Sequence, residues 1–268
     1  MLQADRVLKP ADGVTVLIYH RVGGGSGGEV DLDVDAFRAQ LEHLRDHHTV
    51  IDLDNAAAVL AGDGVDGAAA GGGAVFPENA VVVTFDDGTD DFCDHVVPAL
   101  VEYGIPATLY AATHFIDSGE AFPWGAPPAS WPGLRDAAST GLVTIGSHTH
   151  THALLDRLAP DAIADELDRS IDLIGDRLGI AARHFAYPKA LPPSPAADAA
   201  VRARFASAAL AGTRANPYGH TDPHRLWRSP VQQRDGLHWF AHKADGGLGL
   251  EDRIRDVLNR RRYAGATT

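Results

Sequence analysis

The sequence has little cysteine, a deficit of basic residues and no long apolar run. Cys93 is its one cysteine in 268 residues, so no disulfide can form within the chain, and compartment cannot be inferred from cysteine pairing. Its 36 acids against 23 lysines and arginines give a net charge of −13, which disfavours nucleic acid and anionic membrane surfaces as partners. The first apolar run, 14–19, is too short and too late for a signal-peptide core, and no run approaches the length that spans a bilayer. We therefore expect a cytoplasmic protein without a membrane partner, secreted only if a leader has been removed.

The chain does have enough apolar residues, 45%, for one large core. Short β-rich runs alternate with segments whose apolar residues recur every three or four positions, the spacing typical of helices. This alternation predicts an α/β fold around a parallel sheet, open or closed into a barrel. We expect a single domain over 1–268 with its core at about 14–231. Strands are expected in the runs that begin at Ala80 and Val143 and at 14–19, 50–53, 107–112, 184–188, 207–211 and 226–231, and helices at 34–47, 55–60, 90–103, 134–140, 161–178, 196–205 and about 250–262.

The first polar pattern is an acid pair after the run that begins at Ala80. Residues 80–88 read AVVVTFDDG, so Asp86 and Asp87 follow directly on the apolar residues. Charges do not belong inside a strand that is covered on both faces, so we expect the acids at its carboxyl end. Neighbouring strand residues point to opposite faces, but Gly88 lets the chain turn sharply, so that both carboxylates can reach one site. The alternative for these three residues alone is a solvated turn.

A histidine cluster follows the run that begins at Val143. Residues 147–152 read SHTHTH and place His148, His150 and His152 within five positions. A single histidine is more often a core or surface residue, but three directly after a strand are hard to explain by packing. Carboxylates and imidazoles at the ends of separate strands are typical of a divalent metal site with an open position. We therefore favour a metal site.

Together the two patterns resemble a known enzyme family. The segments 84–88 (TFDDG) and 147–152 (SHTxxH) look like the first two motifs of the polysaccharide deacetylases, the carbohydrate esterases of family 4. The resemblance covers about 14–231 and keeps the order of the motifs. It implies a distorted, incomplete (β/α)7-type barrel of parallel strands, with catalytic groups at the carboxyl ends of the strands. Within the family, the chain is most similar to the circularly permuted subgroup that deacetylates biofilm exopolysaccharides.

The resemblance also implies the members of the site. Asp87, His148 and His152 match the ligands of one divalent metal ion, with zinc as the first expectation and cobalt, nickel or iron as alternatives. His150 occupies a variable position between two of them and is left out of the ligand set. Asp86 would be the general base, since a carboxylate with an ordinary pKa of about 4 is ionised at neutral pH.

The third motif of the family departs from its common form in this sequence. Ala186 stands where many members have an arginine that orients the base, and Arg228 on the last strand is our candidate replacement, with a plain surface residue as the alternative. Tyr187 is typical of the biofilm subgroup and is included among the substrate-binding residues. Lys189 occupies the position whose backbone N–H helps to bind the oxyanion in the family. Ala190 replaces the usual glycine, which calls the local turn into question.

Two further residues complete the predicted site. His20 ends the first strand, as the catalytic histidine does in the permuted subgroup, and an imidazole with a pKa of about 6.5 suits the protonation of a leaving amine. The alternative is a structural histidine that caps the strand. Trp124 lies in an aromatic, proline-rich segment. Such aromatics either stack on sugar rings or pack the loop onto the protein, and both interpretations stay open.

Three functions agree with these residues. The first is a metal-dependent hydrolase that removes N-acetyl or O-acetyl groups from an acetylated glycan or amino sugar. The second is an amidase of the same fold for a small non-sugar molecule or natural-product intermediate, which the lack of a recognisable leader favours. The third is a sugar-binding module that keeps the metal site without turnover, which the departures at Lys189 and Ala190 favour. Release of acetate separates the first from the third, and small acetamides and cyclic imides, tested beside N-acetylglucosamine oligomers, separate it from the second.

Overall fold

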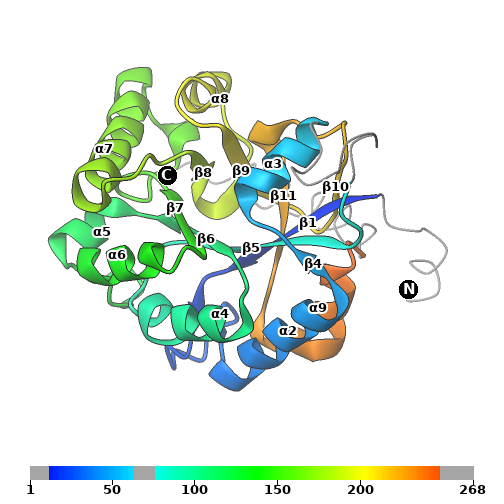
Figure 1. The fold of residues 1–268 in the computed structure, drawn as a ribbon. Coiled ribbons are helices and arrows are strands. Elements are labelled where there is room, and N and C mark those ends of the chain that lie inside the picture. The colour runs from blue at the N-terminus through cyan, green and yellow to red at the C-terminus, as the bar shows by residue number, and fades with distance from the viewer. Residues whose placement is uncertain (1–11, 63–75, 248–268) are drawn as a thin grey trace.

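A ring of parallel strands forms the centre of the molecule in the computed structural model, which describes residues 12–62 and 76–247. Within these ranges, seven parallel strands pair in chain order, and the last pairs with the first, so the ring is closed (Figure 1). The pairing of β7 with β8 is the weakest, because one residue pair, Ser147 with Phe185, forms it. The expected α/β barrel is therefore confirmed. Its strands are β1 (Gly13–Tyr19), β5 (Ala80–Phe85), β6 (Ala107–Ala111), β7 (Val143–Ser147), β8 (His184–Ala186), β9 (Ser207–Ala211) and β11 (Leu226–Pro230).

Helices surround the ring, and short strands extend it (Figure 1). Strand β4 (Thr49–Val50) adds to β5 in parallel, and β10 (Asn216–Pro217) pairs with β1 in the antiparallel sense. Strands β2 (Arg21–Val22) and β3 (Asp31–Leu32) form a separate pair. The helices are α2 (Val34–His47), α3 (Leu53–Ala61), α4 (Val97–Tyr103), α5 (Thr113–Ser118), α6 (Trp131–Ser139), α7 (Pro160–Leu178), α8 (Pro195–Arg202) and α9 (Gly236–Ala244).

The interior of the ring is filled by side chains whose sizes complement one another. Tyr110 is fully buried there, packed with small and β-branched residues that include Val82, Ala186 and Ala209. Gly146 makes room for it, because a Cβ at this position would lie 2.9 Å from the Tyr110 ring and 2.6 Å from the His184 carbonyl oxygen. The barrel is thus a packed core, and its polar groups are gathered at the carboxyl ends of the strands.

Several boundaries differ from those expected from the sequence. The expected helix 90–103 is divided into a π-helical turn, Phe92–Val96, and α4. The expected strand 50–53 is shorter because the Asp52 side chain accepts a hydrogen bond of 2.7 Å from the Asn55 N–H and so starts α3 at Leu53. Helices α5 and α9 were not expected from the sequence.

The expected helix at about 250–262 lies outside the described residues. None of the helices in the described ranges combines the length and the apolar character needed to cross a bilayer.

Candidate functional site

The acid pair lies in a tight turn directly after β5. The Asp86 N–H donates to the Tyr19 carbonyl at 3.0 Å, so β1 fixes the first acid, and the Ala112 N–H donates to the Asp87 carbonyl at 2.9 Å, so the segment after β6 fixes the second. Asp87 has a φ of 76° and Gly88 a φ of 93°, both in the left-handed region. This break in the strand conformation lets neighbouring carboxylates approach the same imidazole: oxygens of Asp86 and Asp87 lie 3.9 Å and 3.7 Å from Nε2 of His148.

His148 follows β7 and is held in one orientation. Its N–H donates to the Ala111 carbonyl at 3.0 Å, and its ring Nδ1 lies 2.8 Å from the Ala186 carbonyl oxygen. Because a carbonyl can only accept, Nδ1 carries the proton of this bond, and the lone pair of Nε2 is left to face Asp87. This is the tautomer that a metal-ligating histidine needs.

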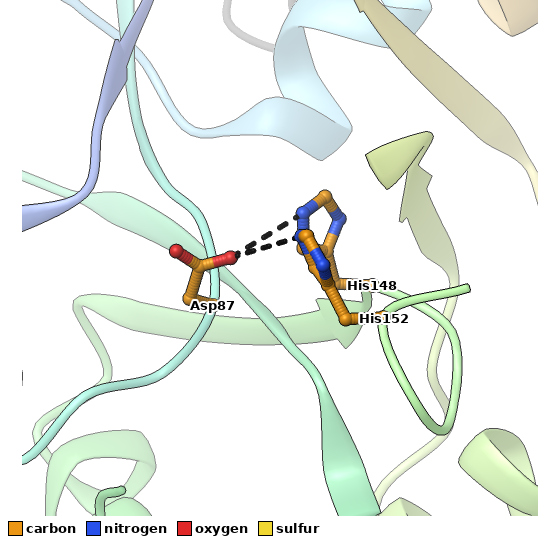
Figure 2. Close-up of side chains that lie close together, drawn as sticks. All are labelled: Asp87, His148 and His152. Atoms are coloured by element: carbon orange, nitrogen blue, oxygen red, sulfur yellow. Dashed lines mark ion pairs between the residues drawn. The ribbon is translucent and has the colours of Figure 1, made fainter. Parts of the chain in front are cut away.

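His152 completes a triangle of ligand atoms with Asp87 and His148 (Figure 2). Its Nε2 lies 3.4 Å from Oδ1 of Asp87, and the three ligand atoms all lie within 4.8 Å of one another. In a tetrahedral zinc site with bonds of about 2.1 Å, two ligand atoms are about 3.4 Å apart, so the spacing fits one ion. Within the described residues, no other group of three potential ligands is as compact.

The protonation states of the triangle also suit a cation. Burial and the neighbouring His148 ring lower the pKa of His152 to about 3, so this imidazole is neutral at ordinary pH. Burial raises the pKa of Asp87, which is 6% exposed. A bound cation would compensate this desolvated carboxylate, as the chemistry of a mixed carboxylate and imidazole site requires.

The loop that carries the two histidines has an unusual backbone and a carboxylate partner. Thr149 and His152 have φ values of 65° and 61°. Glu166 of α7 accepts hydrogen bonds from the N–H groups of His150 and Thr151 at 3.0 Å and 2.8 Å. Glu166 was not among the residues predicted from the sequence. Glu166 lies on the same face of α7 as the buried residues Ile163, Leu167 and Ser170. A charged residue on the apolar face of an amphipathic helix was the signal that could have identified it.

His150 lies apart from the triangle. Its Nδ1 is 3.0 Å from the Thr113 hydroxyl, and the His114 N–H donates to its carbonyl at 2.8 Å. These contacts with α5 agree with leaving His150 out of the ligand set.

Asp86 is paired with Arg228, the middle residue of β11. Two guanidinium nitrogens contact its two oxygens at 2.6 Å and 2.9 Å, and one of them also donates to the Thr84 hydroxyl at 3.1 Å. Arg228 is 0% exposed, which excludes the alternative of a surface residue. Burial by itself raises the pKa of Asp86, but Arg228 and His148 outweigh it and hold that pKa well below its usual range. Asp86 is therefore an ionised carboxylate in a fixed orientation.

His20 lies between β1 and β2, at the same end of the barrel. The register pairs Tyr19 with Phe85, so His20 follows β1 at the level where Asp86 follows β5. Its Nδ1 is buried without a hydrogen-bond partner in the described part of the chain. Asp91 holds the next residues by accepting from the Arg21 side chain at 3.0 Å and from the Val22 N–H at 2.8 Å. The ring thus borders the site on a fixed backbone.

The segment after β8 forms a tight turn without glycine. Lys189 and Ala190 have φ values of 55° and 52°, and the Ala190 N–H donates to the Tyr187 carbonyl at 2.8 Å. The replacement of the usual glycine by Ala190 has therefore not prevented the turn. The Lys189 side chain is exposed, and its charge acts on the His152 ring. Tyr187 is 3% exposed and packs against Phe185 in the core outside the barrel, so its side chain is not available to a substrate.

Trp124 lies beside His152, one of the three candidate ligands. Its ring stacks on Phe122 at 4.9 Å and meets the His152 ring edge-on at 5.7 Å, while 48% of the residue stays exposed. Phe122 is buried and packs on Phe115. The segment is thus anchored by Phe122, and Trp124 presents a free face next to His152.

Known proteins resemble this chain in sequence and in fold. The family model described as polysaccharide deacetylase matches residues 74–207, half of the chain, and includes both motifs but neither His20 nor Arg228. A poly-β-1,6-N-acetyl-D-glucosamine N-deacetylase of Escherichia coli K12 is 34% identical over 86 residues, which are 29% of this chain and 13% of that relative. The chain therefore spans a small part of the length of the curated relative that it matches.

Two solved structures cover nearly the whole barrel. IcaB from Ammonifex degensii has a TM-score of 0.74 at 25% identity and covers 88% of this chain and 98% of its own. The deacetylase PplD of Streptococcus pyogenes has a TM-score of 0.73 at 18% identity and covers 87% and 99% of the two chains, a likeness of fold. With the matched family model and the two motifs in their expected places, the chain belongs to the polysaccharide deacetylase family.

Proposed function

We propose that this protein is a metal-dependent deacetylase that removes N-acetyl groups from the amino-sugar residues of a glycan. The observation that carries the proposal is the triangle of Asp87, His148 and His152 next to the buried pair of Asp86 and Arg228. Family membership supports the reaction class, and the name of the matched Escherichia coli relative supports an N-acetylglucosamine polymer as the substrate class.

Asp87, His148 and His152 would hold one divalent cation, with zinc as the first candidate and cobalt, nickel or iron as alternatives. When bound, such a cation activates water and polarises the acetyl carbonyl as a Lewis acid. Asp87 contributes the negative charge of the site and the rings of His148 and His152 complete it, so a single carboxylate serves the ion and Asp86 is left for proton transfer.

Asp86 acts as the general base. Its two oxygens are occupied by the Arg228 fork, which fixes the plane of the carboxylate and keeps it ionised. An ionised, oriented carboxylate at the barrel end accepts a proton from the attacking water. Arg228 thus orients the base, the role of the arginine that Ala186 replaces.

His20 and the turn at Lys189 act on the other side of the amide. The imidazole of His20 donates a proton to the leaving amine. The left-handed turn presents the Lys189 backbone N–H toward the developing oxyanion, and its exposed ammonium adds positive charge nearby. Trp124 offers a flat face on which a sugar ring stacks next to the acetamido group under attack.

The test combines metal analysis with an acetate assay on the full chain. Purified protein is expected to bind one divalent ion and to release acetate from β-1,6-linked N-acetylglucosamine oligomers, to lose both after treatment with a chelator, and to regain both with zinc or cobalt. Asp87→Ala should lose the ion and the activity. His150→Ala, in the same loop but bonded to Thr113, should keep the ion.

Each of the other functions has its own result in this assay. Release of acetate from small acetamides but from no glycan oligomer would favour the amidase. Metal and oligomer binding without acetate release would favour the sugar-binding module. A protein that binds no divalent ion at all would refute the proposal.

A further inference from the structure

The loop between the two histidines of the triangle is held in a conformation that its own residues disfavour. Thr149 and His152 both adopt left-handed φ values, although neither is glycine and threonine is β-branched. Such a backbone persists only where the surrounding structure determines it. The position of the His152 ring relative to His148 therefore depends on the groups that hold this loop.

Glu166 on α7 is the charged group that holds it. One carboxylate oxygen accepts from the N–H groups of His150 and Thr151, at 3.0 Å and 2.8 Å, and the other accepts from the Thr151 hydroxyl at 2.7 Å. Two successive N–H groups that converge on one oxygen fix the direction of the chain just before His152. Hydrogen bonds to an ionised acceptor are about twice as strong as neutral ones, so Glu166 is the strongest of these supports.

The other groups that hydrogen-bond to the loop are neutral. They contact other atoms of the loop, so Glu166 is the acceptor for the N–H groups of His150 and Thr151. The Ser147 hydroxyl accepts from the Thr149 N–H at 3.2 Å and lies 2.6 Å from the Ser170 hydroxyl, one helical turn after Glu166. The His114 N–H donates to the His150 carbonyl at 2.8 Å. Glu166 of α7 thus accepts from two N–H groups of the loop, and α5 donates to two of its carbonyls, those of Thr149 and His150.

We propose that Glu166 is a positioning residue for the metal centre, which orients the loop 148–152 so that His152 faces Asp87 and His148 before the cation binds. The inference rests on the proposed function in one respect, that the triangle binds a divalent cation. Without Glu166 the two N–H groups turn to water, the loop samples conformations that its residues prefer, and the cation must order His152 as it binds. The affinity for the cation falls, while the barrel keeps its fold.

The experiment measures metal affinity in three variants of the full chain. Glu166→Ala removes the acceptor, Glu166→Gln keeps its size without the charge, and Asp172→Asn removes one charge from an exposed position of the same helix. Each chelator-treated protein is titrated with Zn²⁺ against a chromophoric competitor and with Co²⁺ by visible absorption. Urea unfolding of the metal-free proteins shows which of them are folded.

The dissociation constant for Zn²⁺ should rise about 10- to 100-fold in Glu166→Ala and about three- to tenfold in Glu166→Gln, by analogy with residues that orient metal ligands. Asp172→Asn should bind as the wild type does. The Co²⁺ spectrum of both Glu166 variants should change in intensity, since the ligand geometry is relaxed, and the turnover number at saturating Zn²⁺ should recover much of its wild-type value.

Wild-type affinity in the folded Glu166 variants, or an equal loss in Asp172→Asn, would overturn the inference and leave the proposed function standing. If Glu166→Ala does not fold, the Zn²⁺ affinity of Glu166→Gln, compared with that of the wild type, decides for or against the inference. A wild-type protein that binds neither metal would instead refute the proposed function itself, so the two failures are distinguishable.

Discussion

Replacing Arg228 by methionine should destabilise the fold strongly, because the change leaves a carboxylate buried without its counter-charge. Arg228 is 0% and Asp86 4% exposed, and the two side chains share a bidentate contact at 2.6 Å and 2.9 Å. Methionine is close enough in length to fill much of the space, so the lost charge rather than a cavity dominates the effect.

Removing one member of a buried ion pair costs about 3–5 kcal/mol, since the remaining charge stays desolvated. The full exclusion of Arg228 from solvent means that no screening reduces this figure. If the free energy of unfolding falls by about 3 kcal/mol per molar urea, the urea concentration at the midpoint of unfolding should fall by roughly 1 to 1.7 M. The measurement is urea unfolding of metal-free protein at pH 8, so that cation binding does not contribute.

The pair of Arg204 and Asp168 provides a matched control. Its guanidinium contacts the carboxylate through Nε and one terminal nitrogen at 2.6 Å and 2.8 Å, also a bidentate contact, but the side chains are 24% and 52% exposed. Exposed pairs contribute about 0.2–1 kcal/mol, so Arg204→Met should move the midpoint by roughly 0.3 M or less. The comparison isolates burial as the variable.

Adding Asp86→Asn to Arg228→Met should restore part of the lost stability, because the double variant buries no unpaired charge. A loss below about 1 kcal/mol in Arg228→Met, or a double variant that is less stable than either single variant, would refute the reasoning. Either result would mean that water or another group compensates Asp86 in the interior.

Three further predictions concern the proton donor, a buried histidine away from the site and the exposed aromatic. His20→Asn should slow hydrolysis of the acetamido substrate by about 10²–10⁴-fold. It should slow hydrolysis of 4-nitrophenyl acetate much less, because nitrophenolate leaves without a proton. Equal losses on the two substrates would contradict the role of His20 as proton donor. Burial lowers the pKa of His184, so as the pH falls the unfolded chain takes up a proton at this residue before the folded chain does. At pH values below about 6.5, the free energy of unfolding should therefore decrease by up to about 1.4 kcal/mol per pH unit. Urea unfolding at pH 8 and about pH 5.5 should show a smaller loss in His184→Gln than in the wild type. Trp124→Ala should raise KM for glycan oligomers about three- to tenfold at an unchanged kcat, whereas Trp239→Ala, an exposed tryptophan on α9, should leave both unchanged.

The parallel sheet and the placement of the two motifs could be predicted because they depend on patterns that are local in the sequence, whereas the barrel was expected from the family resemblance. Strands buried on both faces give continuous apolar runs, and parallel strands bring their carboxyl ends to one side. Acids and histidines that end two such runs must therefore meet, as Asp87 and His148 do. The position of His20 followed from the same rule, since it ends β1, which pairs with β5.

Other features depend on contacts that the sequence does not display. Glu166 reads as one more charge on an amphipathic helix, and only the packing of α7 against the histidine loop makes it an acceptor. Helix α9 buries Phe240 but exposes Leu237 and Trp239, so it shows no apolar stripe. Tyr187 was placed in the site by resemblance, although strand alternation alone, with Ala186 facing inward, would have turned its side chain outward.

Backbone strain is concentrated at the site and indicates how the site is organised. Of the six non-glycine residues with left-handed φ in the described ranges, all but Asn79 lie in loops at the candidate site: Asp87, Thr149, His152, Lys189 and Ala190. Each costs about 1 kcal/mol or more, and their sum is comparable to the net stability of a typical domain. The loops therefore cannot hold these shapes alone; Glu166 holds the 148–152 loop, and backbone hydrogen bonds to neighbouring segments hold the turns at Asp87 and after β8. Because the folded protein already holds these loops in place, a cation bound by the proposed ligands would not have to spend binding energy on ordering them.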